Sequence, residues 1–368
     1  MKVLLCGGGT AGHVMPAVAI AEIIEKHFKD VDVRFAGRSG GAENAPYERS
    51  GRRLYTVDIR GFSRSISINN AKSIFKMIKS GRIAREILLD FNPDLIIGTG
   101  GYVCYPFIRQ GQRMGIATVI HESNAYPGLV TRMLGKRCDR LLLNMEAAAE
   151  HLKGAKNIAI VGNPTRSAFT SISKSDARKR LGVEVGEKLV VSFGGSLGAE
   201  KLNESMAALI KRLAGSAKNV RFVHATGKSA YNAFKAKYPE LFIKYPNVQI
   251  IPYIENMPVV LTAADLAISR SGAMTVSELG RASTPSILIP SPNVTANHQY
   301  ANALHMQKIG AAMIIEEKDL TEKHLYECVT RLLQDGIRLA DMRRAASASV
   351  KKDTDKMIAS AIKEILGL

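Results

Sequence analysis

The sequence lacks tryptophan, and its 368 residues include only four cysteines, Cys6, Cys104, Cys138 and Cys328. None of these has the Cys-x-x-Cys spacing, which argues against a disulfide framework and against a zinc site. The sequence also lacks an uninterrupted apolar run of about 18 residues, and the short apolar run after Lys2 cannot serve as a signal peptide. We therefore expect a protein of the cytoplasm that has no membrane-spanning helix.

Acidic residues are scarce relative to basic ones. The chain has 33 Asp and Glu residues and 51 Lys and Arg residues, which gives a formal net charge of +18. Such an excess predicts attraction to a polyanion or an anionic surface: nucleic acid, acidic lipid or a phosphorylated substrate. The sequence contains no RNP-type, helix-turn-helix or finger pattern, so we expect no nucleic-acid partner.

Short aliphatic runs alternate with longer amphipathic ones along most of the chain. This pattern predicts parallel sheets covered by helices on both faces, and a chain of this length predicts two or three domains. The expected strands are 2–5, 33–36, 95–97, 118–120, 157–161, 189–192, 220–224, 248–251, 266–268, 286–289 and 312–315. The two halves begin with similar segments, "VLLCGGGTAGH" in the first and "LVVSFGGSLGAEKLNESM" in the second. We place the boundary between the domains near "VGNPTRSAF".

The stretch "CGGGTAGH" places Gly7, Gly9 and Gly12 in the pattern G-x-G-x-x-G. Glycines between a strand and a helix let backbone N–H groups approach a phosphate, whose charge the helix dipole stabilises. A dinucleotide site further requires an acid at the end of the second strand, where this chain has Arg38. An Arg there could accept a 2′-phosphate, so an NADP-dependent oxidoreductase stays an alternative. That reading does not explain His13 or the two later glycine turns.

Seven motifs then occur in a characteristic order: "GGGTAGHVMPA", "GTGGYVCYP", "HESNAYPGL", "VGNPTR", "FGGSLGA", "SRSGAMTVSE" and "HQYANA". Their order and separations resemble those of the MurG family, the bacterial glycosyltransferases of peptidoglycan synthesis. The resemblance extends from residue 1 to about residue 320. It implies an α/β protein of the GT-B architecture, in which two Rossmann-like doubly wound parallel-sheet domains face a cleft.

The resemblance also implies the activity. The enzyme would move N-acetylglucosamine (GlcNAc) from UDP-GlcNAc to the C4 hydroxyl of the MurNAc unit of undecaprenyl-pyrophosphoryl-MurNAc-pentapeptide (lipid I). The product would be lipid II, formed with inversion and without a cofactor or a metal, by a peripheral protein on the cytoplasmic face of the cell membrane. Residues 1–163 would bind the acceptor and face the membrane, 164–345 would bind UDP-GlcNAc, and 346–368 would form a helix that returns to the first domain.

Two further alternatives remain at this point. A UDP-sugar glycosyltransferase acting on a diacylglycerol-type lipid would share the fold, but its acceptor has no pyrophosphate for the loop Gly100-Gly101-Tyr102 to bind. By resemblance, these three residues contact the acceptor pyrophosphate. A nucleotide-sugar binding module without catalysis is the other alternative.

Inverting transfer needs a base for the acceptor hydroxyl and stabilisation of the departing UDP. His13 matches the family's loop histidine and is the first candidate for the base, because histidine titrates near neutral pH. Its alternative role is structural, or limited to binding phosphate. Glu122 in "HESN" is the rival base, with a strand-end carboxylate paired to a basic residue as its alternative.

The resemblance assigns the donor contacts residue by residue. Glu278 would bind the ribose, although Thr275 to Glu278 also fit an S/T-x-x-E capping box. Arg166 would reach the leaving pyrophosphate, because a planar guanidinium grips phosphate oxygens in pairs; otherwise it is a solvated linker charge. The remaining assignments are Ser196 for the donor phosphate, Ile254 for the uracil, Asn124 with His298 or Gln299 for the sugar, Ala273, Met274, Thr275, Val276 and Ser277 for sugar and phosphate, and Thr10, Ala11 and Gly12 as loop contacts.

The segment 69–90, "NNAKSIFKMIKSGRIAREILLD", combines an apolar face with many cations. A basic amphipathic helix can lie on an anionic leaflet, where each Lys or Arg contributes about 1 kcal/mol. We expect anionic membrane lipids as partners; the alternative is a stripe that faces the core. The residues concerned are Ile74, Phe75 and Ile78, with Lys72, Lys76 and Lys79.

Overall fold

The computed structural model describes residues 1–41, 44–59, 68–165, 169, 172–195, 198–215, 217, 219–294, 297–351 and 353–368, with the backbone alone for 11 and 68–78. The chain forms two compact units. Unit 1 comprises 1–164 together with 351–368, and unit 2 comprises 165–350. The sequence predicted domain boundaries after residue 163 and after residue 345. The boundaries between the two units lie after Pro164 and after Val350.

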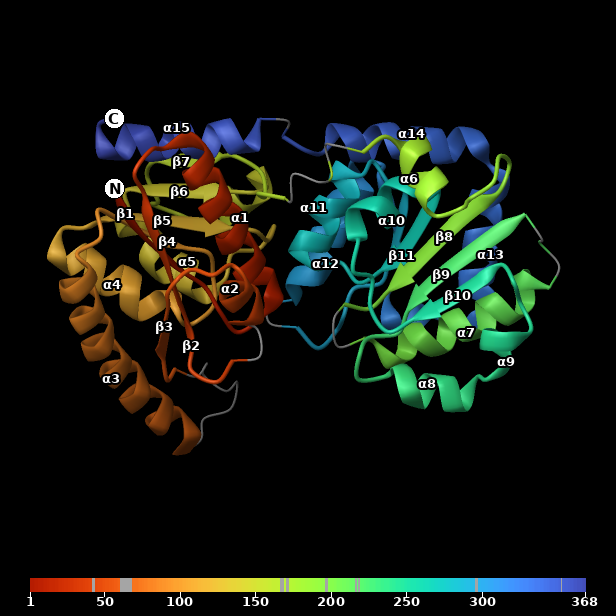
Figure 1. Ribbon diagram of the computed structural model, residues 1–368, viewed down its shortest axis with the longest axis horizontal. Helices are drawn as coiled ribbons and strands as arrows, with labels where there is room; N and C mark the ends of the chain where they lie inside the picture. The colour runs from red at the N-terminus through yellow and green to blue at the C-terminus, as the bar shows by residue number, and fades with distance from the viewer. Residues whose placement is uncertain are drawn as a thin grey trace. The chain divides into compact units, whose positions relative to one another are not determined.

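Unit 1 is built on a seven-stranded parallel sheet with the strand order β3-β2-β1-β4-β5-β6-β7 (Figure 1). Its central strands are apolar on both sides because helices cover both faces. The strands are β1 (Lys2–Cys6), β2 (Asp32–Arg38), β3 (Leu54–Val57), β4 (Leu95–Gly98), β5 (Ala117–Glu122), β6 (Arg140–Leu143) and β7 (Ile158–Ile160).

Two separate cores lie on the two faces of this sheet. On one face α1 (Ala11–His27) and the last helix, α15 (Thr354–Leu366), pack against the strands, with Ile20 and Ile362 fully buried. On the other face lie α3 (Ile68–Phe91), α4 (Cys104–Met114) and α5 (Leu129–Leu134). The short elements of this unit are α2 (Ala45–Arg49), η2 (Gly135–Arg137) and η3 (Glu146–His151). The C-terminal helix is therefore part of unit 1.

Unit 2 repeats the plan with a six-stranded parallel sheet in the order β10-β9-β8-β11-β12-β13. Its strands are β8 (Lys188–Phe193), β9 (Val220–Ala225), β10 (Val248–Ile251), β11 (Leu266–Ser269), β12 (Ser286–Leu288) and β13 (Ala312–Ile314). Its helices are α6 (Lys174–Arg180), α7 (Glu200–Ala214), α8 (Tyr231–Lys237), α9 (Glu240–Ile243), α10 (Met257–Ala263), α11 (Ala273–Arg281), α12 (His298–Lys308), η6 (Glu317–Asp319), α13 (Glu322–Gln334) and α14 (Gly336–Ala348).

The expectation of two doubly wound parallel sheets is confirmed, and each strand that the sequence predicts is present. The strands β3 and β6 were not predicted. The basic segment 69–90 is helical, as α3, although the side chains of Lys72, Ile74, Phe75, Lys76 and Ile78 lie outside the description. Within the described ranges, no helix combines the length and the apolarity needed to cross a bilayer.

Candidate active site

Both sheets reverse their strand order beside glycine-rich loops. In unit 1 the reversal lies between β1 and β4, and in unit 2 between β8 and β11. Open α/β sheets bind ligands at this position, beyond the carboxyl ends of the strands. The loops that follow these four strands each lead into a helix, α1, α4, α7 or α11, so the glycine motifs fall where the fold binds ligands.

The two glycine loops of unit 1 pack directly on each other. The Gly8 amide donates a hydrogen bond to the Gly100 carbonyl at 3.3 Å. A Cβ atom on Gly101 would lie 2.0 Å from the Gly8 carbonyl oxygen, and its φ of +81° is one that other residues rarely adopt. Any side chain at position 101 would therefore separate the loops. Tyr102, the third residue of the expected acceptor loop, packs against the core beneath.

His13 lies in the first turn of α1 and is half-buried. Its Nδ1 is 3.0 Å from the Gly8 carbonyl oxygen, with the Thr10 hydroxyl 3.3 Å away. A carbonyl only accepts, so in the neutral ring Nδ1 carries the hydrogen and the lone pair belongs to Nε2. This is the tautomer in which Nε2 can accept a proton. Thr10 is the exposed N-cap residue of α1, and Gly12 belongs to its first turn.

Glu122 ends β5 and is 5% exposed. One carboxylate oxygen accepts from the amide and the side chain of Asn124, both at 3.0 Å. The other accepts from the Gly128 amide at 2.9 Å and the Thr131 hydroxyl at 2.7 Å. These partners are amides of the loop after β5 and a hydroxyl of α5, rather than the basic residue that the sequence suggested. These four hydrogen bonds make Glu122 an organiser of the segment that follows β5.

In unit 2 the loop after β8 is also held close to its neighbours. Gly198 has a φ of +81°, and a Cβ atom there would lie 2.1 Å from the Thr226 carbonyl oxygen. The same carbonyl accepts a hydrogen bond from Asn203 on α7 at 2.9 Å. These contacts hold the loop after β8 and the first turns of α7 against the end of β9. Ser196, the expected phosphate contact, lies outside the described residues.

The capping-box alternative for Glu278 is wrong. Helix α11 begins at Ala273 with Gly272 as its N-cap residue, so Thr275 already lies inside the first turn. An N-cap residue must precede the helix, and position 275 cannot fill that role. Glu278 stands on the next turn and is half-exposed. The expected sugar and phosphate contacts 273–277 form the first turns of α11, with the Ser277 hydroxyl donating to the Ala273 carbonyl at 3.0 Å.

Gln299 connects the start of α12 to the loop before it. Its side-chain oxygen accepts from the Ser291 amide at 2.9 Å, and its main-chain oxygen accepts from the Ser271 hydroxyl at 2.8 Å. Asn302 donates to the Ser271 carbonyl at 3.1 Å. These bonds join the starts of α11 and α12, which carry the expected donor contacts. The neighbouring His298 is half-exposed.

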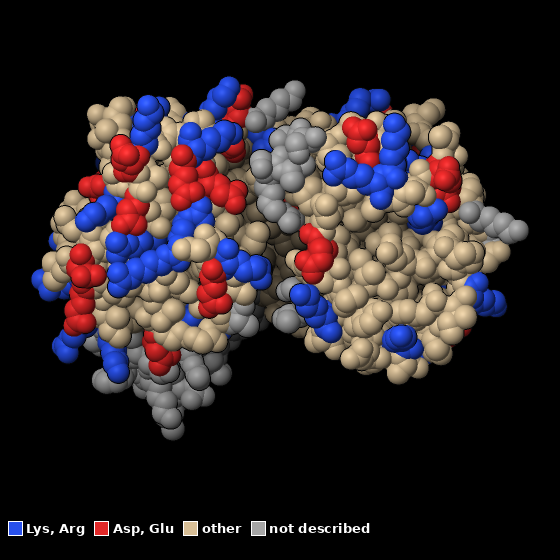
Figure 2. Space-filling view, in the orientation of Figure 1, with Lys and Arg blue, Asp and Glu red and all other residues tan. Residues whose placement is uncertain are grey.

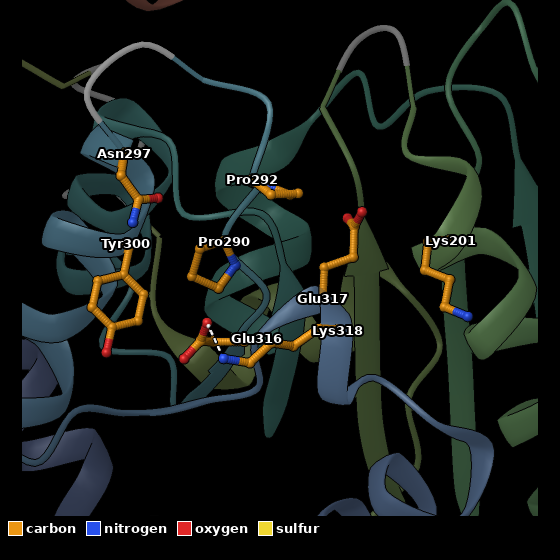
Figure 3. A pocket seen from close by; sticks show the side chains of 8 residues that line it. All are labelled: Lys201, Pro290, Pro292, Asn297, Tyr300, Glu316, Glu317 and Lys318. Carbon is orange, nitrogen blue, oxygen red and sulfur yellow. Dashed lines mark ion pairs between the residues drawn. The ribbon is translucent and has the colours of Figure 1, made fainter.

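A cavity of about 480 Å³ lies beside the start of α12 in unit 2 (Figure 3). Figure 3 shows Asn297 and Tyr300 on one side and Lys201 on the other, with an ion pair between Lys318 and Glu316 at 3.2 Å. The lining combines charges, an amide, a phenol and apolar ring faces, from Lys201, Pro290, Pro292, Asn297, Tyr300, Glu316, Glu317 and Lys318. Its size and mixed polarity suit a small polar ligand.

Arg270 supports the loops beside this cavity and was not predicted as a site residue. Its guanidinium donates to the carbonyl oxygens of Ile289 at 3.2 Å and Pro290 at 3.3 Å, and it pairs with Glu317. The arginine thus ties the loops after β11, β12 and β13 together. The available signal was a basic residue placed directly after a buried strand in "SRSGA".

Ile254, Arg166 and Ala11 are further expected donor contacts. Ile254 is 3% exposed and packs inward, whereas Tyr253 before it is 37% exposed. Arg166 lies outside the described residues, as does the side chain of Ala11.

The helices on the α3, α4 and α5 side of the unit 1 sheet carry exposed cations and exposed apolar side chains. Lys79, Arg82 and Arg85 are exposed on the described part of α3. Leu129 and Met133 on α5 are 40% and 51% exposed. A cavity of about 320 Å³ beside α5 is lined by Tyr126, Arg132, Lys136, Glu150, His151, Leu152, Lys153 and Ala155. On the face of unit 1 that Figure 2 shows, by contrast, basic and acidic side chains are interspersed.

Comparison with known proteins places the chain among glycosyltransferases. Residues 3–143 match the glycosyltransferase family 28 N-terminal domain, and residues 189–358 match the glycosyltransferase family 28 C-terminal domain. A relative from Acetivibrio thermocellus is 41% identical over 366 residues, covering 100% of this chain and 98% of its own. It is named UDP-N-acetylglucosamine–N-acetylmuramyl-(pentapeptide) pyrophosphoryl-undecaprenol N-acetylglucosamine transferase, as is a Clostridioides difficile relative that is 36% identical, covering 99% of this chain and 89% of its own.

Solved structures agree with this placement. The crystal structure of Acinetobacter baumannii MurG matches with a TM-score of 0.77 and 25% identity over 99% of both chains. A UDP-GlcNAc 2-epimerase from Neisseria meningitidis bound to UDP-GlcNAc has a TM-score of 0.68 at 14% identity, covering 99% of this chain and 100% of its own, which shows a shared fold.

Proposed function

Because this chain belongs to the MurG family within glycosyltransferase family 28, we propose that it transfers GlcNAc from UDP-GlcNAc to the MurNAc unit of the undecaprenyl-pyrophosphoryl acceptor, lipid I, to give lipid II. The full-length match to relatives named for this reaction carries the proposal. It favours this activity over an NADP-dependent oxidoreductase, a diacylglycerol glycosyltransferase and a binding module.

The donor is assigned to unit 2. The start of α11 supplies backbone N–H groups and the positive end of a helix dipole, which stabilise the charge that develops on the departing UDP. Glu278, one turn further, would accept hydrogen bonds from the ribose hydroxyls. Gln299 and His298 at the start of α12 would contact the sugar, and Ser196 and Ile254 keep their expected roles at the phosphate and the uracil.

The acceptor is assigned to unit 1. The packed glycine loops at Gly8 and Gly100-Gly101 leave backbone groups uncovered by side chains, which suits close approach of a pyrophosphate. His13 would take the proton of the C4 hydroxyl as the oxygen attacks the anomeric carbon and the bond to UDP breaks. The Nδ1 contact with Gly8 supports this role, because it leaves the lone pair of the neutral ring on Nε2.

The transfer is tested by UDP release from UDP-GlcNAc in the presence of a lipid I analogue. Wild type should release UDP above the acceptor-free control, and His13→Asn should lower kcat by about 10²- to 10⁴-fold with UDP-GlcNAc binding retained. His324→Asn, at an exposed position of unit 2, is the matched control and should leave the rate unchanged. Equal UDP release with and without acceptor would contradict the activity, and an active His13→Asn would contradict the base.

We further propose that the protein acts on the cytoplasmic face of the membrane, held by unit 1. The apolar side chains Leu129 and Met133 would enter the lipid headgroup region while the cations of α3 and α5 attract anionic headgroups. The expected face of α3, with Ile74, Phe75 and Ile78 beside Lys72, Lys76 and Lys79, would act with them.

Vesicle sedimentation tests this membrane contact. Wild type should bind vesicles with anionic phospholipid more tightly than zwitterionic ones, and added salt should weaken binding, because screening shortens the range of the attraction. Leu129→Ser with Met133→Ser should reduce binding. Ile337→Ser removes an apolar side chain of unit 2 that is 79% exposed, and it should have no effect. Unchanged binding of the α5 variant and of an Ile74, Phe75, Ile78→Ser variant would refute the proposal.

A further inference from the structure

The hydroxyl of Thr99 joins the second glycine loop of unit 1 to the residue proposed as the base. Thr99 follows β4 and is 1% exposed. Its Oγ1 lies 2.7 Å from the main-chain oxygen of His13 and 3.2 Å from that of Cys6. A hydroxyl has one hydrogen to donate, and the shorter distance directs it to His13. We infer that Thr99 is a positioning residue for His13, an inference that rests on the proposed function.

Three contacts together fix where the imidazole lies. The Thr99 hydroxyl holds the main chain of residue 13, and the Gly8 carbonyl accepts from Nδ1 at 3.0 Å. The third contact is steric: a Cβ atom built on Gly100 would lie 2.4 Å from Cδ2 of His13, so the ring rests against the backbone of Gly100. Thr99 and Gly100 are adjacent in the chain. The loop that the ring rests on is therefore the loop that holds its main chain.

This arrangement has a catalytic consequence. A general base must lie within hydrogen-bond reach of the proton that it takes, and a displacement of about 1 Å can cost about 100-fold in rate. Without the Thr99 hydroxyl, the first turn of α1 can move relative to the Gly100 loop. The Nδ1 hydrogen bond to Gly8 then lengthens. The Gly8 carbonyl therefore stabilises the imidazolium that forms on proton uptake less than in the wild type.

The test compares Thr99→Val, which keeps the shape and removes the hydroxyl, with Thr99→Ser, which keeps the hydroxyl. The assay is UDP release with a lipid I analogue. Thr99→Val should lower kcat by about 10- to 100-fold, while the KM for UDP-GlcNAc, which unit 2 binds, changes by less than about twofold. Thr99→Ser should stay within about threefold of wild-type kcat. The acidic limb of the kcat–pH profile should move to lower pH in Thr99→Val, because the imidazolium is less stabilised.

A loss of folded protein would lower kcat without moving the pH limb, so the profile separates positioning from stability. If Thr99→Val does not fold by circular dichroism, Thr99→Ala takes its place with the same expected split. Wild-type kcat and pH limb in a folded Thr99→Val, or a defect that Thr99→Ser fails to restore, would overturn the inference.

The outcomes distinguish this inference from the proposed function. Thr99→Val should have no additional effect in a His13→Asn background, because both changes act through the same base. If His13→Asn is itself as active as wild type, the proposed base is wrong. If His13→Asn lowers kcat as expected, the base stands. The positioning role of Thr99 is then wrong if Thr99→Val lowers kcat further in the His13→Asn background, or if it has no effect in the wild-type background.

Discussion

Lowering the pH should destabilise unit 2 through His224, which is fully buried on β9. Its Nδ1 is 2.8 Å from the Ser192 hydroxyl. Burial lowers the pKa of His224 to about 4, and a hydrogen bond with the Ser192 backbone opposes the shift. In the unfolded chain the same imidazole has its ordinary pKa of about 6.5. Between these two pKa values the imidazole is protonated in the unfolded chain but neutral in the folded protein.

The sign and the size follow from proton linkage. Stability is complete above pH 6.5, declines as the pH falls from 6.5 toward 4 and levels off below. A separation of about 2.5 pKa units corresponds to about 3.4 kcal/mol in total, of which about 2 kcal/mol is lost by pH 5. That loss is a large part of the stability of an ordinary domain.

Urea unfolding followed by far-ultraviolet circular dichroism between pH 8 and pH 5 measures this dependence. His224→Gln removes the titrating group, so its free energy of unfolding should fall by about 2 kcal/mol less than that of wild type over this range. His324→Gln changes an exposed histidine of the same unit and should keep the wild-type slope. The reasoning fails if His224→Gln and wild type lose stability in parallel.

Three further outcomes are expected. Gly101→Ala should lower kcat/KM for the acceptor at least about tenfold with UDP-GlcNAc binding intact, because the added Cβ meets the Gly8 carbonyl. Gly115→Ala is the control for backbone strain, because Gly115 has a φ of +72° and an added Cβ would meet nothing within 4 Å. Equal activities of the two variants would refute the crowding argument. Asp265→Asn should lower the free energy of unfolding by about 3 kcal/mol in urea titrations, because it removes the carboxylate that Lys174 contacts at 2.7 Å; a loss below about 1 kcal/mol would count against that role. Glu278→Gln should weaken UDP-GlcNAc binding in calorimetry by about 10-fold, and unchanged affinity would remove the ribose contact.

The Asp265 prediction has a pH counterpart. Burial alone would raise the pKa of Asp265, but the hydrogen bonds from Lys174 and from the Leu189 amide lower it below its usual value. The carboxylate therefore stabilises the fold above its unfolded pKa of about 3.9, and this contribution is lost as the pH falls further. His224 acts at higher pH than Asp265, so the His224→Gln comparison above pH 5 is not obscured by this group.

The sequence predicted the strands whose apolar runs stand between polar segments, and it missed two whose local signals are ambiguous. The strand β6, "RLLL", is rich in leucine, which favours helix as readily as strand, and its burial comes from pairing with β5 and β7. The strand β3, "LYTV", lies at the edge of the sheet beside β2, and one of its four residues is buried. For both strands the deciding contacts are distant in sequence.

The same limit applies within the site. The motif Thr275 to Glu278 fits a capping box locally, yet the helix starts at Ala273 because Gly272 serves as the N-cap residue. For Glu122 the sequence indicated a strand-end carboxylate, but not its four hydrogen-bond donors, which come from the loop after β5 and from Thr131 on α5. Motif spacing led to the candidate site residues, whereas their hydrogen-bond partners depend on loop geometry.

The two units share one sheet topology but hold their loops in different ways. In unit 1 the loops at the strand reversal contact each other through glycines, and the ring of His13 rests against that contact. In unit 2 the loop after β8 contacts the end of β9 through Gly198, while Arg270 and Gln299 tie the neighbouring loops together. A base must be placed relative to one proton, whereas a nucleotide sugar needs contacts along its whole length. Substitutions that move His13 should therefore act on kcat, and substitutions among the tied loops of unit 2 should act first on the KM for the donor.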